Sequence, residues 1–423
     1  MVLTQLNQTS SPQPTPPELR GYDYDLVIVG GGIVGLTLAS ALKDSGLNIL
    51  LIEAKVASLA VTKGQAYAVH MLSALIYQGI GIWDKILPQI AKYRQVRLSD
   101  ADYPDVVEFA TTDISQDTPE LGYVAEHQAL LEPLQEFVQN CPNVTYLCPA
   151  EVVSTKYQAD EVVINIKIGE QVKTVKSKLL VAADGSRSPI RQAVGIKTHG
   201  WKYWQSCIVA FVKPEKSHND TAYERFWTSG PFAILPLPGN RCRIVWTAPH
   251  AEAKALCALD DEQFLQELSR RFGQHMGKLE LLGDRFVFPV QLMQSDRYVL
   301  PRLALVGDAA HNCHPVGGQG LNLGIRDAAA LAQVIQAAHQ AGADIGNLQI
   351  LKQYERWRQK ENLTILGFTD LLDRMFSNQF PPVVFVRRLG LWFLQRVPIL
   401  KVFMLKLMIG LKGKTPEIAK QSN

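Results

Sequence analysis

Cysteine, long apolar runs and repeated motifs are scarce in this 423-residue sequence. Its six cysteines follow neither metal nor disulfide spacing, which favours a reducing, cytoplasmic location. The uncharged apolar runs are too short to span a bilayer. Residues 1–21 are rich in Ser, Thr, Gln and Pro and lack an apolar signal core, so we expect a disordered tail there. No motif of a Ser-His-Asp or Cys-His hydrolase and no internal repeat is present.

One glycine-rich fingerprint, G-x-G-x-x-G, occurs near the N-terminus. It follows a short apolar run of β-forming residues and precedes Leu and Ala at helical spacing. In such a strand, turn and helix, Gly30 permits the tight turn and Gly32 lets a pyrophosphate approach the backbone. Gly35 lets the helix pack closely on the strand, and the helix N-terminus faces the phosphates. The pattern therefore predicts a dinucleotide site.

Glu53 closes the next apolar run, about twenty residues after the fingerprint, where an acidic side chain can bind ribose hydroxyls. An acid at this position favours a free 2′-hydroxyl, so the site suits the ADP half of FAD or NAD and disfavours resident NADP. The choice between FAD and NAD depends on segments further along the chain.

Two distant segments favour FAD. An apolar run over 179–183 ends at Asp184, and a second over 303–306 ends at Gly307 and Asp308. At a strand end, Asp308 can accept hydrogen bonds from ribityl or ribose hydroxyls. The glycines at 317, 318 and 320 leave backbone amides free to approach an isoalloxazine ring. A helix beginning near residue 321 would point its positive end at the reduced flavin.

These motifs resemble those of the FAD-dependent aromatic hydroxylases of the p-hydroxybenzoate hydroxylase type, the class A flavin monooxygenases. The greatest likeness within them is to the ubiquinone-biosynthesis hydroxylases, over roughly residues 23–370. The Gly-Asp motif carries most of it, with Gly307, Asp308, Ala309, Ala310, His311, Pro315, Gly318, Gln319, Gly320, Asn322, Gly324, Asp327, Ala328 and Leu331 at the family's spacing. Relatives usually have an Arg near residues 63–65, whereas this sequence has Lys63, Gly64 and Gln65.

The resemblance implies an α/β fold: a Rossmann-like FAD-binding domain, an inserted, mainly antiparallel β-sheet substrate domain, and a C-terminal helical tail. We expect the FAD-binding domain over 22–78, 120–198 and 289–360, and the substrate domain over 79–119 and 199–288. The C-terminal helical, membrane-associating region would cover 361–423. Aromatic residues crowd the substrate domain, and some should line a pocket while others form core: Trp201, Tyr203, Trp204, Phe211, Tyr223, Phe226, Trp227, Phe232 and Trp246.

The resemblance also implies site residues. No side chain is required as a nucleophile, because the chemistry is centred on the flavin beside Pro315, Gly317 and Gly318. The residues expected to bind FAD are Gly30, Gly32, Gly35, Glu53, Gln128, Asp184, Gly307, Asp308, Gly318, Gln319, Gly320, Leu321 and Asn322. We expect no metal, because His311, Cys313 and His314 lack an obvious fourth ligand. His311 is interpreted instead as a support of that loop.

The implied reaction is reduction of FAD by transiently bound NAD(P)H, reaction with O2 to a C4a-hydroperoxyflavin, and transfer of one hydroxyl group to an electron-rich ring. No second glycine-rich fingerprint exists for a resident nicotinamide cofactor, which agrees with transient binding. Two alternatives stay open. A flavoenzyme of the same fold could epoxidise or reduce an isoprenoid, or the protein could be a non-catalytic, flavin-binding subunit of a quinone-synthesis complex.

The C-terminal charge indicates a partner. From residue 380 onward there are eight Lys or Arg against one acidic residue, a net charge of +7, whereas the whole chain carries +3. Apolar residues interleaved with these cations are typical of a helix lying on an anionic membrane surface. The alternative is a pair of helices packed on the enzyme with solvated basic faces. Membrane attachment would suit a prenylated phenol as the substrate. Nucleic acid could bind the same positive charge, but no other feature of the sequence supports nucleic-acid binding.

Overall fold

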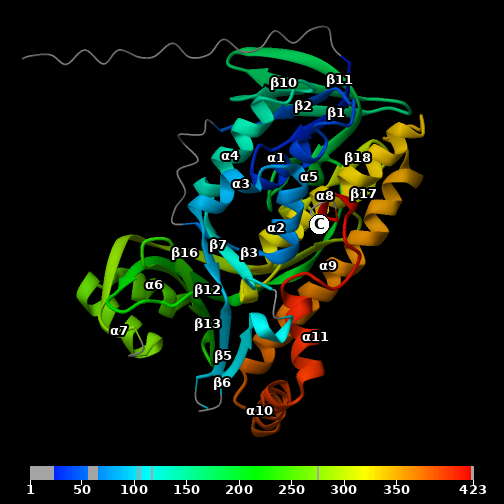
Figure 1. The fold of residues 1–423 in the computed structure, drawn as a ribbon. Coiled ribbons are helices and arrows are strands. Elements are labelled where there is room, and N and C mark those ends of the chain that lie inside the picture. The colour runs from blue at the N-terminus through cyan, green and yellow to red at the C-terminus, as the bar shows by residue number, and fades with distance from the viewer. Residues whose placement is uncertain are drawn as a thin grey trace, which may run out of the picture.

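The computed structural model describes residues 23–55, 65–101, 103, 106–115, 118–273 and 276–420. The expected tail at 1–21 and the departures at Lys63 and Gly64 lie outside these residues. Within them, the chain forms two large sheets, one small sheet and a set of C-terminal helices (Figure 1).

The first large sheet holds the motif segments. Its strands run in the order β17-β18-β11-β1-β2-β8, and the pairs β18-β11, β11-β1, β1-β2 and β2-β8 are parallel. The antiparallel strands β9 and β10 extend β11. The bounds are β1 (Asp23–Val29), β2 (Ile49–Ile52), β8 (Val144–Leu147), β9 (Glu151–Tyr157), β10 (Val162–Ile168), β11 (Gln171–Ala182), β17 (Val299–Leu300) and β18 (Leu303–Leu305).

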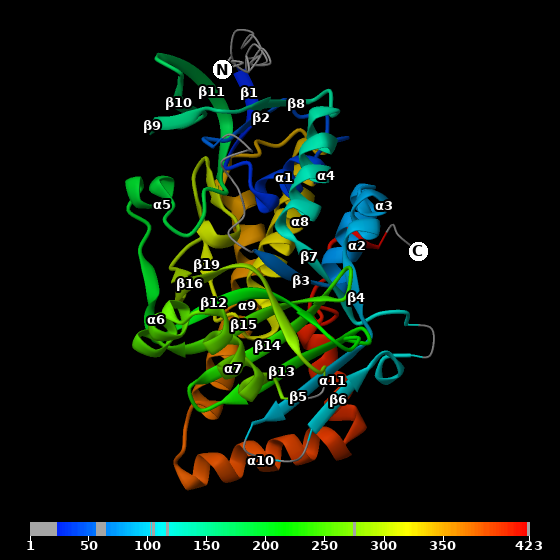
Figure 2. The same cartoon turned by 90° about the vertical axis from the view of Figure 1, so that its left-hand side faces the viewer.

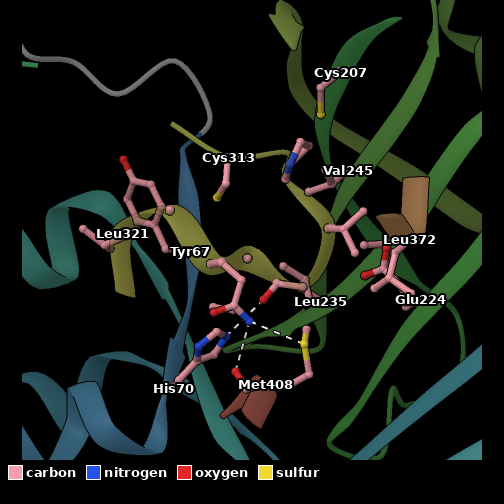
Figure 3. Close-up of a pocket in the computed structure, with 18 of the residues that line it drawn as sticks. Tyr67, His70, Cys207, Glu224, Leu235, Val245, Cys313, Leu321, Leu372 and Met408 are labelled. Carbon is pink, nitrogen blue, oxygen red and sulfur yellow. Dashed lines mark hydrogen bonds between the residues drawn. The ribbon is translucent and has the colours of Figure 1, made fainter. Parts of the chain in front are cut away.

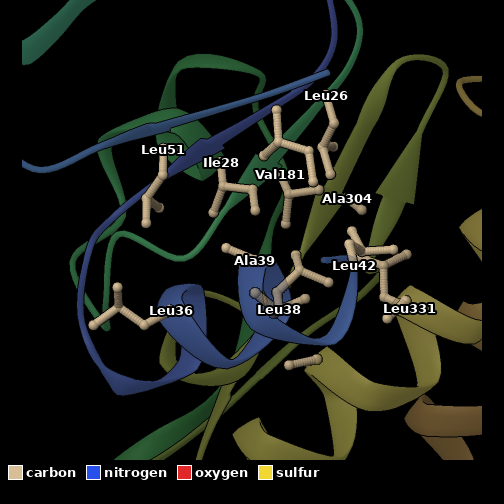
Figure 4. Close-up of a cluster of buried hydrophobic side chains, with 14 of the residues drawn as sticks. Leu26, Ile28, Leu36, Leu38, Ala39, Leu42, Leu51, Val181, Ala304 and Leu331 are labelled. Carbon is tan, nitrogen blue, oxygen red and sulfur yellow. The ribbon is translucent and has the colours of Figure 1, made fainter. Parts of the chain in front are cut away.

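The core of this domain lies between the sheet and the helices α1 (Ile33–Ala41) and α8 (Gln319–Gln340) (Figure 4). Leu26 and Ile28 of β1 meet Leu38 of α1 and Leu331 of α8 in one fully buried cluster. Strands covered on both faces read as continuous apolar runs, which is why the sequence carries such runs rather than an alternating pattern. The motif turns follow the carboxyl ends of β1, β11 and β18, where open α/β sheets bind ligands.

The second large sheet is mainly antiparallel, with strand order β19-β16-β12-β15-β14-β13-β5-β6 and one parallel pair, β13 with β5. Its outer face is covered by α6 (His250–Ala258) and α7 (Asp261–Phe272), which pack on the cluster around Trp246. The strands are β5 (Gln95–Asp100), β6 (Val106–Ala110), β12 (Thr198–Pro214), β13 (Thr221–Trp227), β14 (Gly230–Leu237), β15 (Arg241–Pro249), β16 (Leu279–Ser295) and β19 (His311–Asn312).

A three-stranded sheet, β3-β7-β4, lies between the two large sheets (Figure 2). The remaining elements of the N-terminal half are β3 (Ala66–His70), β4 (Ala91–Tyr93), β7 (Gly122–Glu126), α2 (Met71–Ile80), α3 (Trp83–Ile86), α4 (His127–Gln139) and α5 (Pro189–Ala193).

Three helices close the chain: α9 (Leu348–Phe376), α10 (Pro381–Arg396) and α11 (Pro398–Met408). The long helix α9 runs without a break through residue 360, and α10 lies across the end of the molecule beside β6 (Figure 2). In the described part of the chain, no helix combines the length and apolar character needed to cross a membrane. The expected fold class, with a parallel nucleotide sheet, an antiparallel second sheet and C-terminal helices, is confirmed.

Candidate active site

A cavity of about 1010 Å³ lies between the two large sheets and the C-terminal helices. The first sheet contributes Gly32, Gly185 and Asp308, one from each motif segment. The segment 315–321, here called the flavin loop, also lines the cavity along its whole length. The opposite walls are the inner face of the second sheet and apolar side chains of α9 and α11 (Figure 3). Side chains of α10 also line the cavity.

The glycine-rich turn is shaped by close backbone contacts. Gly30 has a φ of +113°, and a Cβ there would overlap the carbonyl group of Ala183. A Cβ on Gly35 would overlap the carbonyl of Gly30. A Cβ on Gly32, by contrast, would meet no atom of the protein within 4 Å, and Gly32 lines the cavity. The fold therefore requires Gly30 and Gly35, whereas the space beside Gly32 is left for a ligand.

Glu53 stabilises the same turn. Its Oε2 accepts the Gly31 N–H at 2.7 Å, and its Oε1 accepts the Lys55 N–H at 2.7 Å. These bonds fix the carboxylate at the end of β2, beside the fingerprint. Its contact with a ribose stays a prediction.

The Asp-Gly motif links two segments of the site. Arg191 donates hydrogen bonds to the carbonyl of Ser186 at 2.8 Å and to that of Ala309 at 2.7 Å. Asp184 accepts the Ile190 N–H at 3.3 Å, and burial raises the pKa of its carboxyl group. Asp184 is not among the residues that line the cavity, although its neighbours Gly185 and Ser186 are.

The flavin loop needs glycine at two successive positions. Gly317 and Gly318 have φ of +64° and +60°, a region that side chains disfavour. A Cβ on Gly318 would lie 2.8 Å from the Cβ of Ala68. His70 Nε2 lies 3.0 Å from the Gly317 carbonyl, and burial lowers the pKa of His70 to about 3, so the neutral ring donates there. The backbone of this loop is thus packed directly against β3.

Asn322 fixes the loop rather than facing the cavity. Its Oδ1 accepts the His70 N–H at 2.8 Å and the Ser73 hydroxyl at 2.7 Å, while its Nδ2 donates to the carbonyls of Ala68 and Gly318. These four bonds use the amide fully within the protein. Gln319, Gly320 and Leu321 do line the cavity, and Gln319 Nε2 donates to the Met408 carbonyl of α11 at 3.0 Å. The sequence alone did not indicate this contact with α11.

Asp308 and its surroundings divide into two layers. The Asp308 carboxyl group opens into the cavity, and its enclosed position raises its pKa. Beneath it, Asp327 lies 2.6 Å from His311 Nε2 and 2.8 Å from Arg358 Nε, and accepts the Gly307 N–H at 3.1 Å. His311 therefore supports the loop through Asp327. The contacts with His311 and Arg358 hold the pKa of Asp327 well below its usual range despite burial.

Several cavity residues were not predicted. Tyr67 donates its hydroxyl to Gln65 at 2.9 Å and lies 3.0 Å from His127 Nδ1, and all three residues line the cavity. Arg243 and Glu224 project from the second sheet, and both are ionisable groups among apolar neighbours. The predicted Gln128 is exposed and does not line the cavity, so its contact with flavin stays a prediction.

Comparison with known proteins agrees with this geometry. The family described as "FAD binding domain" matches residues 23–365. The chain belongs to the FAD-dependent class A monooxygenases related to the ubiquinone hydroxylases. Over 92% of its length it is 38% identical to "Ubiquinone hydroxylase UbiL" of Rhodospirillum rubrum, covering 90% of that protein. It is 33% identical to the "3-demethoxyubiquinol 3-hydroxylase" of Escherichia coli, covering 92% of this chain and 98% of that one.

The chain is also similar to a cyanobacterial protein in sequence and to a bacterial monooxygenase in fold. An "Uncharacterized protein slr1300" of Synechocystis is 50% identical over 94% of this chain and 95% of its own length. Among solved structures, the p-nitrophenol 4-monooxygenase of Pseudomonas putida superposes with a TM-score of 0.78 at 19% identity. That alignment covers 93% of this chain and 99% of the other, and it shows a shared fold.

The residues present fit FAD, the cofactor of this monooxygenase family. The open space beside Gly32 and the two positive-φ glycines of the flavin loop border one continuous cavity. Gly32, Gly185 and Asp308 would hold the nucleotide and ribityl portions, and the flavin loop would hold the ring. These individual roles are proposals, made from the position of each group on the cavity wall.

Proposed function

We propose that this monooxygenase hydroxylates the ring of a prenylated phenol during synthesis of a quinone such as ubiquinone or plastoquinone, with NAD(P)H as the electron donor and O2 as the oxygen source. The observation that carries the proposal is the apolar extension of the cavity. From the flavin loop it continues between α9, α10 and α11, along Phe368, Leu372, Leu394, Leu400 and Met404. A ring beside the flavin loop would leave its isoprenoid tail among these side chains.

The energetics favour such a tail. Each methylene group that moves from water into an apolar environment contributes about 0.8 kcal/mol. Charged side chains are few along this part of the cavity, where Arg387 is already paired with Asp100 at 2.8 Å. The names of the two curated hydroxylases supply independent support, because ubiquinone and demethoxyubiquinol both carry a prenyl tail.

In this mechanism the protein binds the cofactor and the substrate, orients the substrate ring and excludes water from the site. When bound, FAD would supply the redox chemistry, with NAD(P)H as the electron donor and O2 as the oxygen source. The flavin loop would hold the ring edge with backbone groups that Asn322 and His70 keep in place. The apolar sheet face, including Val209 and Val245, would keep water from the reacting centre and hold the ring carbon in line.

Turnover with purified protein tests this proposal. We expect a flavin spectrum, NADH or NADPH oxidation that a prenylated phenol stimulates under air, and a product heavier by one oxygen atom. An unprenylated analogue of the same ring should react with a higher KM, because it lacks the tail that would fill the apolar extension. If the protein binds flavin but no phenol stimulates its NAD(P)H oxidation, an isoprenoid epoxidase or reductase, or a non-catalytic subunit, would be favoured. Mass spectrometry of an isoprenoid incubated with the protein would distinguish these alternatives.

We further propose that α10 and α11 rest on an anionic membrane surface. Large apolar side chains are exposed along both helices: Phe385 is 67% exposed and Ile399 is 84% exposed, and Phe380, Leu389, Trp392, Phe393 and Phe403 are also exposed. The exposed cations of this region include Arg396, Lys412 and Lys414, and Lys406 is half-buried. Apolar side chains flanked by cations complement an interface of lipid tails and anionic headgroups.

Part of the C-terminal charge is used inside the protein. Arg387 is buried and pairs with Asp100, and Lys401 pairs with Asp113 at 2.8 Å. The charge excess counted from the sequence therefore overstates the positive charge available at the surface. The remaining cations are sufficient for the proposal, since a Lys or Arg near an anionic surface contributes about 1 kcal/mol.

Vesicle cosedimentation tests the surface. We expect the enzyme to bind vesicles containing anionic lipid, and the double variant Phe385→Ser, Ile399→Ser to bind at least roughly tenfold more weakly, since each side chain would lose about 1.5–3 kcal/mol of burial. Val172→Ser is the matched control, because Val172 is 61% exposed but lies in the β10-β11 hairpin. If the double variant and the parent protein bind the vesicles equally, α10 and α11 do not form the membrane-binding surface.

A further inference from the structure

The second sheet presents one carboxyl group to the cavity, that of Glu224 on β13. Across the sheet its neighbours in register are Leu98 of β5, Ala233 of β14, and then Val245 of β15 and Val209 of β12. These side chains line the same cavity wall, and all except Glu224 are apolar. An acid in an otherwise apolar row is costly for folding, which makes it a candidate for function.

Glu224 points toward the place expected for the substrate ring. Figure 3 shows its carboxyl group directed from the sheet toward the flavin loop, between Leu235 and Leu372. The backbone of Gly317 in that loop lies close enough to favour the ionised form of Glu224 and so to lower its pKa. Arg243 of β15 lines the same cavity, but among the residues that the structure describes no Lys, Arg or His lies within salt-bridge distance of Glu224. The carboxyl group of Glu224 thus faces the cavity without a direct ion pair.

We propose that Glu224 accepts the hydroxyl proton of the substrate phenol and orients the ring at the flavin loop. This assignment rests on the proposed function. In the step, the ring O–H bond breaks, the proton moves to an oxygen of Glu224, and the electron pair stays on the ring oxygen. The resulting phenolate is the more electron-rich ring and the better acceptor of an electrophilic oxygen. After oxygen transfer, the ring carbon that received the hydroxyl group releases its hydrogen to solvent as a proton, and the ring becomes aromatic again. Glu224 returns its own proton to the ring oxygen, which restores the carboxylate.

The protonation of Glu224 suits this role. Burial raises its pKa to about 7, against the nearby backbone of Gly317, which lowers it. A base works best when its pKa lies near the working pH. Other ionisable groups line the cavity. Burial lowers the pKa of His70 to about 3 and also lowers that of His127, and it raises the pKa values of Cys207 and Cys313 to about 12. Burial raises the pKa values of Tyr67 and Tyr93 as well, and the remaining groups are Tyr223, Arg243, Asp308 and Arg387, which is paired with Asp100.

The pH profile tests the assignment. In the parent enzyme, kcat should fall as pH decreases through about 7, because the carboxylate form becomes protonated. Glu224→Gln should lower kcat by on the order of a hundredfold and remove this acid limb, with KM changed much less. Glu224→Asp should recover part of the rate and the limb. Glu267→Gln on α7 is the matched control and should leave the profile unchanged.

A second readout needs no turnover. A phenol whose ionised form absorbs visible light should bind the oxidised enzyme as phenolate in the parent protein and as neutral phenol in Glu224→Gln. Phenol binding with ionisation unaffected by the substitution would overturn the assignment and leave the proposed function standing. Failure of the parent enzyme to bind any phenol would overturn both. Loss of flavin from Glu224→Gln would indicate that Glu224 positions Gly317 and the flavin loop. That result would also overturn its role as the proton acceptor.

Discussion

Replacing Gly32 with alanine should leave the protein folded and abolish most of its affinity for FAD. The backbone of Gly32 has φ of −74° and ψ of 178°, which any residue adopts without strain. An alanine Cβ there would meet no protein atom within 4 Å. It would project instead into the cavity at the N-terminus of α1, where the pyrophosphate is expected to approach the backbone.

We expect the FAD dissociation constant of Gly32→Ala to rise at least about a hundredfold, or about 2.7 kcal/mol. FAD titration of the apo-protein, followed by tryptophan fluorescence, measures this change, and thermal unfolding without FAD measures the fold. Gly367→Ala is the control, because its Cβ is also unobstructed but lies on α9. Unchanged FAD affinity in Gly32→Ala would mean that the dinucleotide follows another route across the sheet.

Gly35→Ala distinguishes a glycine required by the packing of the fold from one, Gly32, that leaves space for the cofactor. Its Cβ would overlap the carbonyl of Gly30, so this variant should lose stability even without cofactor. The fingerprint predicted both roles from spacing alone, since a short turn between a buried strand and a helix leaves few other backbone solutions. Motif segments of this kind are local, and the sequence is sufficient to place them.

Contacts between distant segments were beyond sequence reasoning. Glu224 lies in an alternating strand, and its facing toward the cavity depends on the register of β13 with β5 and β14. Likewise, the contact of Gln319 with Met408 joins positions 89 residues apart. Composition correctly indicated basic, apolar C-terminal helices, but it could not separate Arg387, buried against Asp100, from the cations left in solvent.

Asn322 shows a different limit. Its place within the Gly-Asp motif predicts a cofactor-binding residue, whereas the hydrogen bonds of its side-chain amide go to the backbone and to Ser73. A motif records which positions a site needs, and it does not distinguish a residue that touches the ligand from one that positions the loop. That distinction comes from counting hydrogen bonds in the folded protein.

Asp327 is such a positioning residue, and Asp327→Ala should strongly destabilise the folded protein. Its carboxylate is fully buried and bonded to His311, Arg358, Asn362 and the Gly307 N–H. Removing it leaves the Arg358 guanidinium buried with reduced compensation, a change that costs about 3–5 kcal/mol. Gly307 also loses its anchor, so the free energy of unfolding and FAD affinity should fall together.

Denaturant unfolding across acid pH distinguishes this charge effect from a simple cavity. The folded-state pKa of Asp327 is held below its ordinary value, so its stabilisation is complete above about pH 4. It is lost as pH falls toward the folded-state pKa. The stability difference between the parent protein and Asp327→Ala should therefore narrow in acid, whereas a lost packing contact would give a constant difference. Glu267→Ala, which removes an exposed partner of Arg270, should cost at most about 1 kcal/mol.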